Sequence, residues 1–323
     1  MPSGRDIKNR IKSIGNTKKI TKAMEMVAAS KMRKAIEAVL RTRTYANLSW
    51  LTVLNLSRSA NSNNQPLHQL LTPRKEIKKV GIILITSNRG LCGGFNAAII
   101  NKVHESIKKY QTMGEQTIIE AEFILVGKKG AAISRHGQTI TADFPKLDLA
   151  SEVNEIVPVA NLVIGEYLSG QYDKVMVAYT DFVSSSKQIP RVKQILPIEI
   201  DKIDDALGIV GEDTRLGLDK EFVEQKEKKY LQSGQFNYEY VFEPSPEEVL
   251  DQMLPRLIEI QLYQALLESN ASEHSARMAA MHQATDAAGD MVNELTLSYN
   301  KARQASITAE IAEISAGANA LAE

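Results

Sequence analysis

Few residues in this 323-residue chain have the types and spacing that enzyme chemistry requires. The sequence contains no Walker phosphate loop, no dinucleotide-binding fingerprint, no HExxH zinc motif and no nucleophile elbow. The histidines are scattered without metal-ligand spacing, and they are His68, His104, His136, His274 and His282. We interpret them as structural or surface groups. The sequence therefore predicts no catalytic residue, no metal site and no cofactor.

One glycine-rich segment has the setting of an anion-binding loop. Residues 86–96, Thr-Ser-Asn-Arg-Gly-Leu-Cys-Gly-Gly-Phe-Asn, follow a predicted strand and precede a predicted helix, where backbone N–H groups can hold an anion. The segment lacks the lysine and hydroxyl pair of a phosphate loop. We favour a tight strand-to-helix turn that needs glycine geometry. A nucleotide-binding α/β protein with helical extensions is the alternative. Cys92 is either a packed small side chain or a reactive thiol at the helix start.

A second segment with potential for recognition is polar and lies near the C-terminus. Residues 300–310, Asn-Lys-Ala-Arg-Gln-Ala-Ser-Ile-Thr-Ala-Glu, interrupt an otherwise apolar helical pattern. These side chains form either a solvated helix face or a set of hydrogen-bonding groups directed at a partner.

The elements that position these segments are two very long helices at the ends of the chain. Residues 5–59 contain one glycine and no proline, and the same holds for residues 256–316. Because proline and glycine are the residues that break helices, their scarcity permits rods of about 80 Å and about 100 Å. Few globular domains need helices of that length, whereas a shaft does.

Apolar residues follow both rods at helical spacing. In the first rod they are Ile7, Ile11 and Ile14, then Ile20, Met24 and Val27, then Met32, Ile36 and Leu40, with a slip of phase after Ile14. In the second rod they are Met281, Thr285, Ala288, Val292, Leu295, Tyr299 and Ala302, then, after a phase shift, Ile307, Ile311, Ile314 and Ala318. Alternating steps of four and three predict a left-handed coiled coil, with the first rod as the antiparallel partner.

The middle of the chain alternates strand and helix patterns. We predict strands at residues 80–86, 123–126, 140–142 and 174–179, with a further extended stretch at 191–198. Helices are expected at 97–110, around 131–136 and at 153–169. This order predicts an open, mostly parallel, Rossmann-like sheet flanked by helices.

The predicted fold class is therefore α/β plus all-α, a long antiparallel coiled coil with an inserted α/β domain. Residues 1–60 and 243–323 form the shaft, 75–200 the α/β domain, and 201–242 a charged insertion with a return strand at 238–242. A helical piece is expected at 219–231 within the insertion. Ser245 and Glu248 match a capping box at the start of the second rod, and Pro255 predicts a kink.

The net charge is zero, but the two ends carry opposite charge. Residues 1–45 hold twelve Lys or Arg and three acids, whereas residues 243–323 hold thirteen acids and four bases. The basic end alone would also suit nucleic acid, but the apolar stripe needs a helical partner.

A single cysteine excludes an intrachain disulfide. The chain start does not resemble a signal peptide, and the longest aliphatic run, residues 82–85, is too short to cross a bilayer.

Several motifs resemble one known family closely, the gamma subunit of the rotary F-type ATP synthase. They lie at residues 11–31, at 87–96 with the core Gly-Leu-Cys-Gly-Gly-Phe-Asn, at 268–278, and at 299–314 with the sequence Tyr-Asn-Lys-Ala-Arg-Gln-Ala-Ser-Ile-Thr-Ala-Glu-Ile-Ala-Glu-Ile. The resemblance covers nearly the whole chain except residues 201–235.

The resemblance implies a rotating central stalk without catalytic sites of its own. Such a subunit transmits torque between the ion-driven c-ring and the hexamer of alpha and beta subunits, and regulates ATPase activity and proton flow. Its α/β domain contacts the epsilon subunit and the c-ring. It binds no nucleic acid, and it is a peripheral protein on the cytoplasmic side of the cell inner membrane, held there only through the complex.

The resemblance also implies which residues contact the alpha and beta subunits. They are Lys18, Lys19, Lys22, Met24, Arg303, Gln304, Ile314 and Leu321. Residues 201–235 differ from the thiol-regulated insert of chloroplast members because they contain no cysteine. We expect this segment to be a regulatory or epsilon-facing arm.

Overall fold

The computed structural model describes residues 4–60, 68–74, 76–113, 120–146, 153–198 and 245–322, with the side chains of 43–60, 110–113, 246–247 and 316–322 left out. The elements in chain order are α1 (Gly4–Ala60), the 3₁₀ helix η2 (Gln69–Leu71), β1 (Lys79–Ile85), α2 (Phe95–Met113), β2 (Glu120–Val126), the 3₁₀ helix η3 (Lys128–His136), β3 (Thr139–Phe144), the 3₁₀ helix η4 (Val153–Glu155), α3 (Val157–Leu168), β4 (Lys174–Phe182), β5 (Gln188–Leu196) and α6 (Pro246–Ala322). The predicted helix at 219–231 and strand at 238–242 lie outside the described residues.

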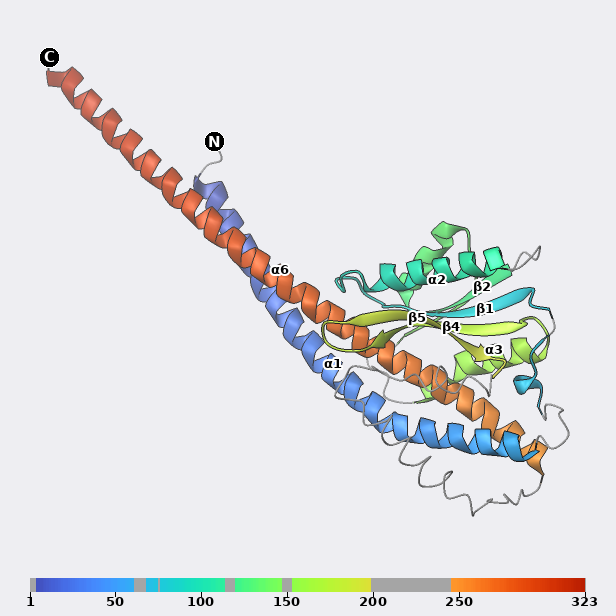
Figure 1. Cartoon of the computed structure of the whole chain (residues 1–323). Coiled ribbons are helices and arrows are strands. Elements are labelled where there is room, and N and C mark those ends of the chain that lie inside the picture. The colour runs from blue at the N-terminus through green and yellow to red at the C-terminus, as the bar shows by residue number, and fades with distance from the viewer. Residues whose placement is uncertain are drawn as a thin grey trace. The chain divides into compact units, whose positions relative to one another are not determined.

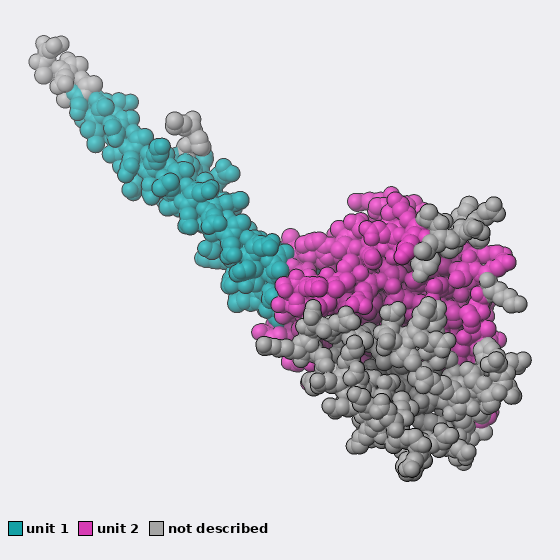
Figure 2. Space-filling view, viewed as in Figure 1, with its two compact units in different colours: residues 1–29, 277–323 teal, residues 30–276 magenta. Residues whose placement is uncertain are grey.

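The chain forms two compact units (Figure 2). Unit 1 comprises Met1–Ala29 and Arg277–Glu323, and unit 2 comprises Ser30–Ala276. Both long helices contribute to both units, since α1 and α6 each continue past the unit boundary. The sequence-based segments 1–60, 75–200, 201–242 and 243–323 stay a prediction.

Unit 2 is built on a five-stranded sheet in the order β3-β2-β1-β4-β5 (Figure 1). The first four of these strands pair in parallel, and β5 pairs with β4 in the antiparallel sense. The prediction of a mostly parallel, Rossmann-like sheet is confirmed. The extended stretch expected at 191–198 belongs to β5, which begins and ends earlier.

The two faces of the sheet bury separate apolar clusters, because successive side chains of a strand point to opposite faces. On β1, Val80, Ile82 and Leu84 pack with α2 residues such as Ile99 and Val103. The intervening side chains pack with α3 and with the part of α6 in unit 2, in a cluster that includes Ile83, Ile85, Val159, Val163, Leu254, Leu262 and Leu266. In Figure 1, α2 and α3 accordingly cover opposite faces.

Two predicted helices of unit 2 differ in detail. The helix expected at 131–136 is the 3₁₀ helix η3, and the helix expected at 153–169 is divided into η4 and α3. A proline near the start of α3 explains the division, since its ring has no N–H and suits the first helical turn but not a helix interior.

The start of α6 matches its prediction. The Glu248 N–H donates to the Ser245 Oγ at 3.3 Å, as an N-cap requires. The helix continues across Pro255 to Ala322, and the kink expected at Pro255 stays a prediction. No helix within the described ranges is long and apolar enough to span a bilayer.

In unit 1, α1 and α6 run antiparallel. The Thr21 and Thr285 hydroxyl groups are 2.8 Å apart, and Glu25 Oε1 lies 3.5 Å from His282 Nδ1. Towards the start of α1, Gly4 lies beside Tyr299. Residue numbers that rise along α1 thus meet numbers that fall along α6, which confirms the antiparallel coiled coil.

The stripe predicted on α6 forms the seam of this coiled coil. Met281, Thr285 and Ala288 are buried, at 5%, 7% and 6% exposure. The next four stripe residues, Val292, Leu295, Tyr299 and Ala302, are half-buried while their neighbours are exposed. This part of the prediction is confirmed.

The stripe predicted on α1 is wrong at three positions, two in its middle third and Leu40 at its end, which is 42% exposed. Ile20 and Val27 are exposed, at 60% and 56%. The seam instead repeats every seven residues without a phase slip, through Ile7, Ile14, Thr21, Ala28 and, in unit 2, Ala35. Small and polar side chains occupy the seam here, so the stripe of large apolar residues does not mark the face of α1 that packs on α6.

Candidate partner-binding surfaces

The glycine-rich segment after β1 is a turn held by hydrogen bonds between its own side chains and backbone. The Ser87 N–H donates to Asn96 Oδ1 at 3.0 Å, and Asn96 Nδ2 donates to Ser87 Oγ at 2.8 Å and to Cys92 Sγ at 3.3 Å. Leu91 and Gly93 have positive φ angles of 63° and 56°. Because these polar groups are satisfied within the segment, the geometry supports a strand-to-helix turn. Cys92 is only 2% exposed, as expected of a packed side chain.

The position where an open α/β sheet usually binds a ligand is closed. Ligands bind outside the carboxyl ends of the strands at the point where the strand order reverses, which here lies between β1 and β4. Thr86 and Ser87 after β1 are fully buried, and Thr180 and Asp181 at the end of β4 are 3% and 2% exposed. The Ser272 Oγ of α6 donates to the Thr180 carbonyl at 3.0 Å. The chain itself therefore covers this edge.

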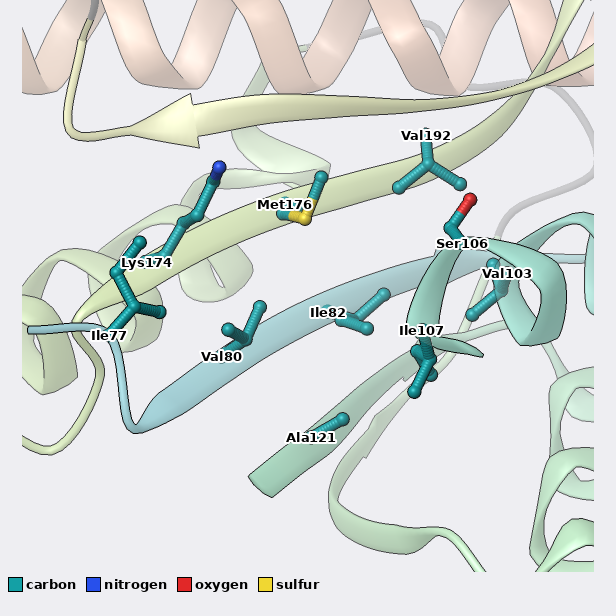
Figure 3. Close-up of a pocket in the computed structure, with 10 residues that line it drawn as sticks. All are labelled: Ile77, Val80, Ile82, Val103, Ser106, Ile107, Ala121, Lys174, Met176 and Val192. Carbon is teal, nitrogen blue, oxygen red and sulfur yellow. The ribbon is translucent and has the colours of Figure 1, made fainter. Parts of the chain in front are cut away.

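An apolar pocket lies elsewhere, between α2 and the sheet (Figure 3). Figure 3 shows Val80 and Ile82 of β1, Val103 and Ile107 of α2, and the Lys174 side chain around it. Its volume is about 50 Å³, whereas sites for nucleotide-sized ligands span roughly 300–1,000 Å³. Among the described residues, no group of three His, Cys, Asp or Glu side chains is placed to hold a metal ion.

The predicted contact residues on α1 lie on the shaft in unit 1. Lys18, Lys19 and Lys22 are exposed, and Met24 is half-buried. The Lys18 Nζ lies over Gly289 of α6, 3.0 Å from where a Cβ would stand. Lys22 Nζ pairs with Glu25 Oε1 at 2.9 Å. The hydrogen bond from Lys22 lowers the pKa of the Glu25 carboxyl below its ordinary value. Lys18 and Lys22 thus contribute to the shaft itself.

An exposed apolar surface on α1 was missed by sequence reasoning. Ile20, Met26 and Val27 are 60%, 59% and 56% exposed. The spacing of Ile20 and Val27 predicts burial against α6, yet the seam runs through Thr21 and Ala28. Exposed apolar side chains that gather into a patch are typical of surfaces that bind another molecule.

The C-terminal part of α6 has no helical partner among the described residues. In Figure 1 it continues beyond the start of α1. Every residue from 303 to 315 is exposed, including Arg303 and Gln304. Ile307, Ile311 and Ile314 are 47%, 59% and 67% exposed. Leu321 lies in the same helix, but its side chain is outside the description.

The expectation that the first rod covers this second stripe is wrong. The described part of α1 begins at Gly4, beside Tyr299, and so reaches only the first stripe of α6. The predicted contact residues therefore form two groups, one along α1 at residues 18–24 and one on the single-helix end of α6 at residues 303–321. The structure does not bring the two groups together into one site.

Comparison with known proteins shows which family has this sequence. The family model for ATP synthase matches residues 3–321. An ATP synthase gamma chain of Legionella pneumophila is 36% identical over 322 residues, covering 99% of this chain and 100% of the relative. One from Heliobacterium modesticaldum is 43% identical, with the same coverage of both chains.

Solved structures share the fold. A chain of the Euglena gracilis mitochondrial ATP synthase OSCP/F1/c-ring structure has a TM-score of 0.61 at 18% identity, covering 98% of this chain and 94% of that one. A chain of the Tetrahymena thermophila mitochondrial ATP synthase central stalk and c-ring has a TM-score of 0.55 at 23% identity, covering 82% and 99%. The predicted fold class is confirmed by these similarities, and the predicted family by the relatives. The chain belongs to the gamma chains of ATP synthase.

Proposed function

We propose that this chain is the rotating central stalk of an F-type ATP synthase, transmitting torque between an ion-driven c-ring and a catalytic hexamer of alpha and beta subunits. It would thereby regulate ATPase activity and proton flow. The observation that carries the proposal is the exposed C-terminal end of α6, where polar Arg303 and Gln304 precede the apolar stripe of Ile307, Ile311 and Ile314. A single helix with this surface is suited to a surrounding partner.

The antiparallel seam suits the part of a stiff, asymmetric rotor. Thr21, Ala28, Thr285 and Ala288 are small and buried, which allows the two helices to approach closely. A bistable catalytic site responds only to a difference in contact between its states. A lopsided rod inside a ring of equivalent sites offers each site a different contact, so turning the rod changes all of them in order.

The proposal also assigns binding partners and a cellular location to the chain. The alpha and beta subunits contact Lys18, Lys19, Lys22, Met24, Arg303, Gln304, Ile314 and Leu321. Residues 1–60 and 243–323 form the shaft, and the α/β domain at 75–200 contacts the epsilon subunit and the c-ring. The chain is non-catalytic and peripheral to the cytoplasmic side of the cell inner membrane. The closed carboxyl edge of the sheet and the small apolar pocket support this over nucleotide binding.

Replacing Arg303 and Gln304 together with alanine tests the contact proposed for the end of α6. We expect the complex to assemble with normal subunit ratios, because both side chains are exposed in the free chain. Proton-driven ATP synthesis should fall severalfold, because charge-assisted hydrogen bonds to the hexamer are lost. Synthesis is measured in membrane vesicles, and assembly by co-purification of the subunits.

Thr308→Ala is the matched control for this pair. It lies on the same exposed segment, but its hydroxyl donates to the Gln304 carbonyl of its own helix at 2.9 Å. We expect it to synthesise ATP at nearly the normal rate. Normal synthesis in the double variant as well would refute the role given to Arg303 and Gln304.

A further inference from the structure

The part of α6 at residues 268–275 is polar yet buried on all sides. Its sequence is Glu-Ser-Asn-Ala-Ser-Glu-His-Ser, and no residue in it is more than 4% exposed. Charged and polar residues are seldom fully buried unless they are paired. A helix that only needed to pack on the sheet would carry apolar residues here, as α6 does at Leu262 and Leu266. The polar composition therefore needs a separate explanation.

An ion pair joins this segment to the loops at the carboxyl edge of the sheet. Lys146, which follows β3, places its Nζ 2.7 Å from Glu273 Oε2, and the two side chains are 1% and 5% exposed. The Asn88 side chain, which follows β1, donates to the Lys146 carbonyl. Asn88 Oδ1 in turn accepts from the Lys128 N–H after β2 at 3.4 Å. Loops after three parallel strands are thus linked through one lysine to α6.

The β4–β5 hairpin holds the same segment of α6 through hydroxyl groups. Ser275 Oγ donates to the Ser185 carbonyl at 2.7 Å, and Gln188 Nε2 donates to Ser275 Oγ at 3.2 Å. One turn earlier, Ser272 Oγ donates to the Thr180 carbonyl of β4 at 3.0 Å. Loops after β1, β2 and β3 and the β4–β5 hairpin therefore all connect to a helix segment of eight residues.

These contacts oppose rotation of α6 about its own axis more strongly than apolar packing would. Apolar contacts are non-directional, so they specify the rotational setting of a helix less sharply than a hydrogen-bonded ion pair does. Turning α6 here would separate Lys146 from Glu273, and breaking a buried ion pair is strongly unfavourable. Buried polar pairs commonly fix register in this way.

We infer that the Lys146–Glu273 pair, supported by Ser272 and Ser275, fixes the rotational setting of α6 on the α/β fold. Torque delivered to the α/β fold would enter the shaft at this point, since α6 continues from it without interruption to Ala322. This inference rests on the proposed rotary function. It assigns Lys146 and Glu273 as positioning residues, because they act through the setting of α6.

The test compares loaded and unloaded activity of the assembled complex. In Lys146→Met with Glu273→Leu, both charges of the pair are replaced by apolar groups of similar size, so neither charge of the pair is left buried alone. ATP-driven proton pumping and proton-driven synthesis in vesicles should fall severalfold, because α6 can then turn on the α/β fold when it works against a load. ATP hydrolysis by the detached head, which works against no load, should stay close to the parent rate.

Two further variants make the result specific. Lys146→Glu combined with Glu273→Lys restores an ion pair with reversed polarity and should recover much of the lost pumping. Lys102→Gln with Glu105→Gln removes an exposed pair on α2, whose atoms are 4.0 Å apart, and should pump normally. If the Met/Leu variant does not assemble, Ser275→Ala removes only a hydroxyl group and should lower pumping to a smaller degree, again without slowing the detached head.

The inference is overturned if the variants that lack the buried contacts pump protons as well as the parent. It is also overturned if hydrolysis by the detached head falls in parallel with pumping, because the pair would then serve stability alone. Failure of the proposed function looks different, since the parent complex itself would neither pump its coupling ion nor synthesise ATP.

Discussion

Replacing Gly127 with alanine is expected to lower the free energy of unfolding by roughly 2–4 kcal/mol, since the new methyl group meets both backbone strain and a fixed atom. Gly127 has a φ angle of 107°, which L-residues rarely adopt. A Cβ at this position would lie 2.4 Å from the Thr86 carbonyl oxygen. Urea denaturation of the full chain measures the effect.

The backbone around Gly127 cannot move aside cheaply. The Gly127 N–H donates to the Phe144 carbonyl at 3.3 Å, and the Thr86 N–H donates to the Val126 carbonyl at 2.9 Å. The Thr86 hydroxyl also donates to the Gly127 carbonyl at 2.9 Å. These bonds connect the ends of three neighbouring strands, so relief of the clash would break links across the carboxyl edge of the sheet.

Gly137→Ala is the matched control. Gly137 also has a positive φ, 73°, but no atom lies within 4 Å of its Cβ position. Only backbone strain remains, so we expect a cost of about 1 kcal/mol. Equal destabilisation by the two substitutions would show that the close approach of Gly127 to Thr86 is unimportant.

The second large effect is expected in the seam of the shaft. Ala28→Leu should destabilise the pairing of α1 and α6 by roughly 1–3 kcal/mol, because three extra carbon atoms must fit into a packed position. Ala28 is 2% exposed and follows Ile7, Ile14 and Thr21 at intervals of seven residues. Forcing the helices apart should also lower coupled ATP synthesis. Thermal unfolding and synthesis in vesicles measure the two effects.

Ala23→Leu controls for the change in composition. Ala23 lies on the same helix, is exposed and is outside the seam, so its replacement should change the free energy of unfolding by less than about 0.5 kcal/mol. If Ala23→Leu were as destabilising as Ala28→Leu, the seven-residue repeat through Ala28 would not be the seam.

Much of this fold could be predicted from local patterns. The scarcity of proline and glycine predicted two rods, and Met281, Thr285 and Ala288 predicted the face of α6 that α1 covers. The strands of the sheet were also predictable, because their apolar runs are short and bounded by turn residues. The first and last residues of helices and strands were less predictable, as the division between η4 and α3 illustrates.

Two features could not be predicted from single-residue hydrophobicity. In α1 the seam uses Thr21 and Ala28, so Ile20 and Val27 appeared to be core residues although they are exposed. In α6 the buried segment at 268–275 is polar, and its partner Lys146 is more than a hundred residues away in the sequence. Burial of this kind depends on tertiary contacts. The small residues Ser269, Ala271, Ser272 and Ser275 are a local signal of close packing.

The predicted contact residues lie in two stretches of the sequence, 18–24 and 303–321, and the structure does not bring these stretches together. Lys18 and Lys22 also have structural contacts, with Gly289 and Glu25 respectively, which a motif cannot reveal. The end of α6 was predicted to have a partner within the chain, but α1 is too short at its described start to reach Ile307.

Direct observation of rotation tests the central proposal. The single cysteine, Cys92, is buried, so Lys128→Cys, at an exposed position of the α/β unit, would carry a probe selectively. With the catalytic hexamer fixed to a surface and ATP supplied, we predict that the probe turns continuously in one direction, with a pause for each catalytic site. Hydrolysis of ATP beneath a stationary or directionless probe would contradict a rotating stalk.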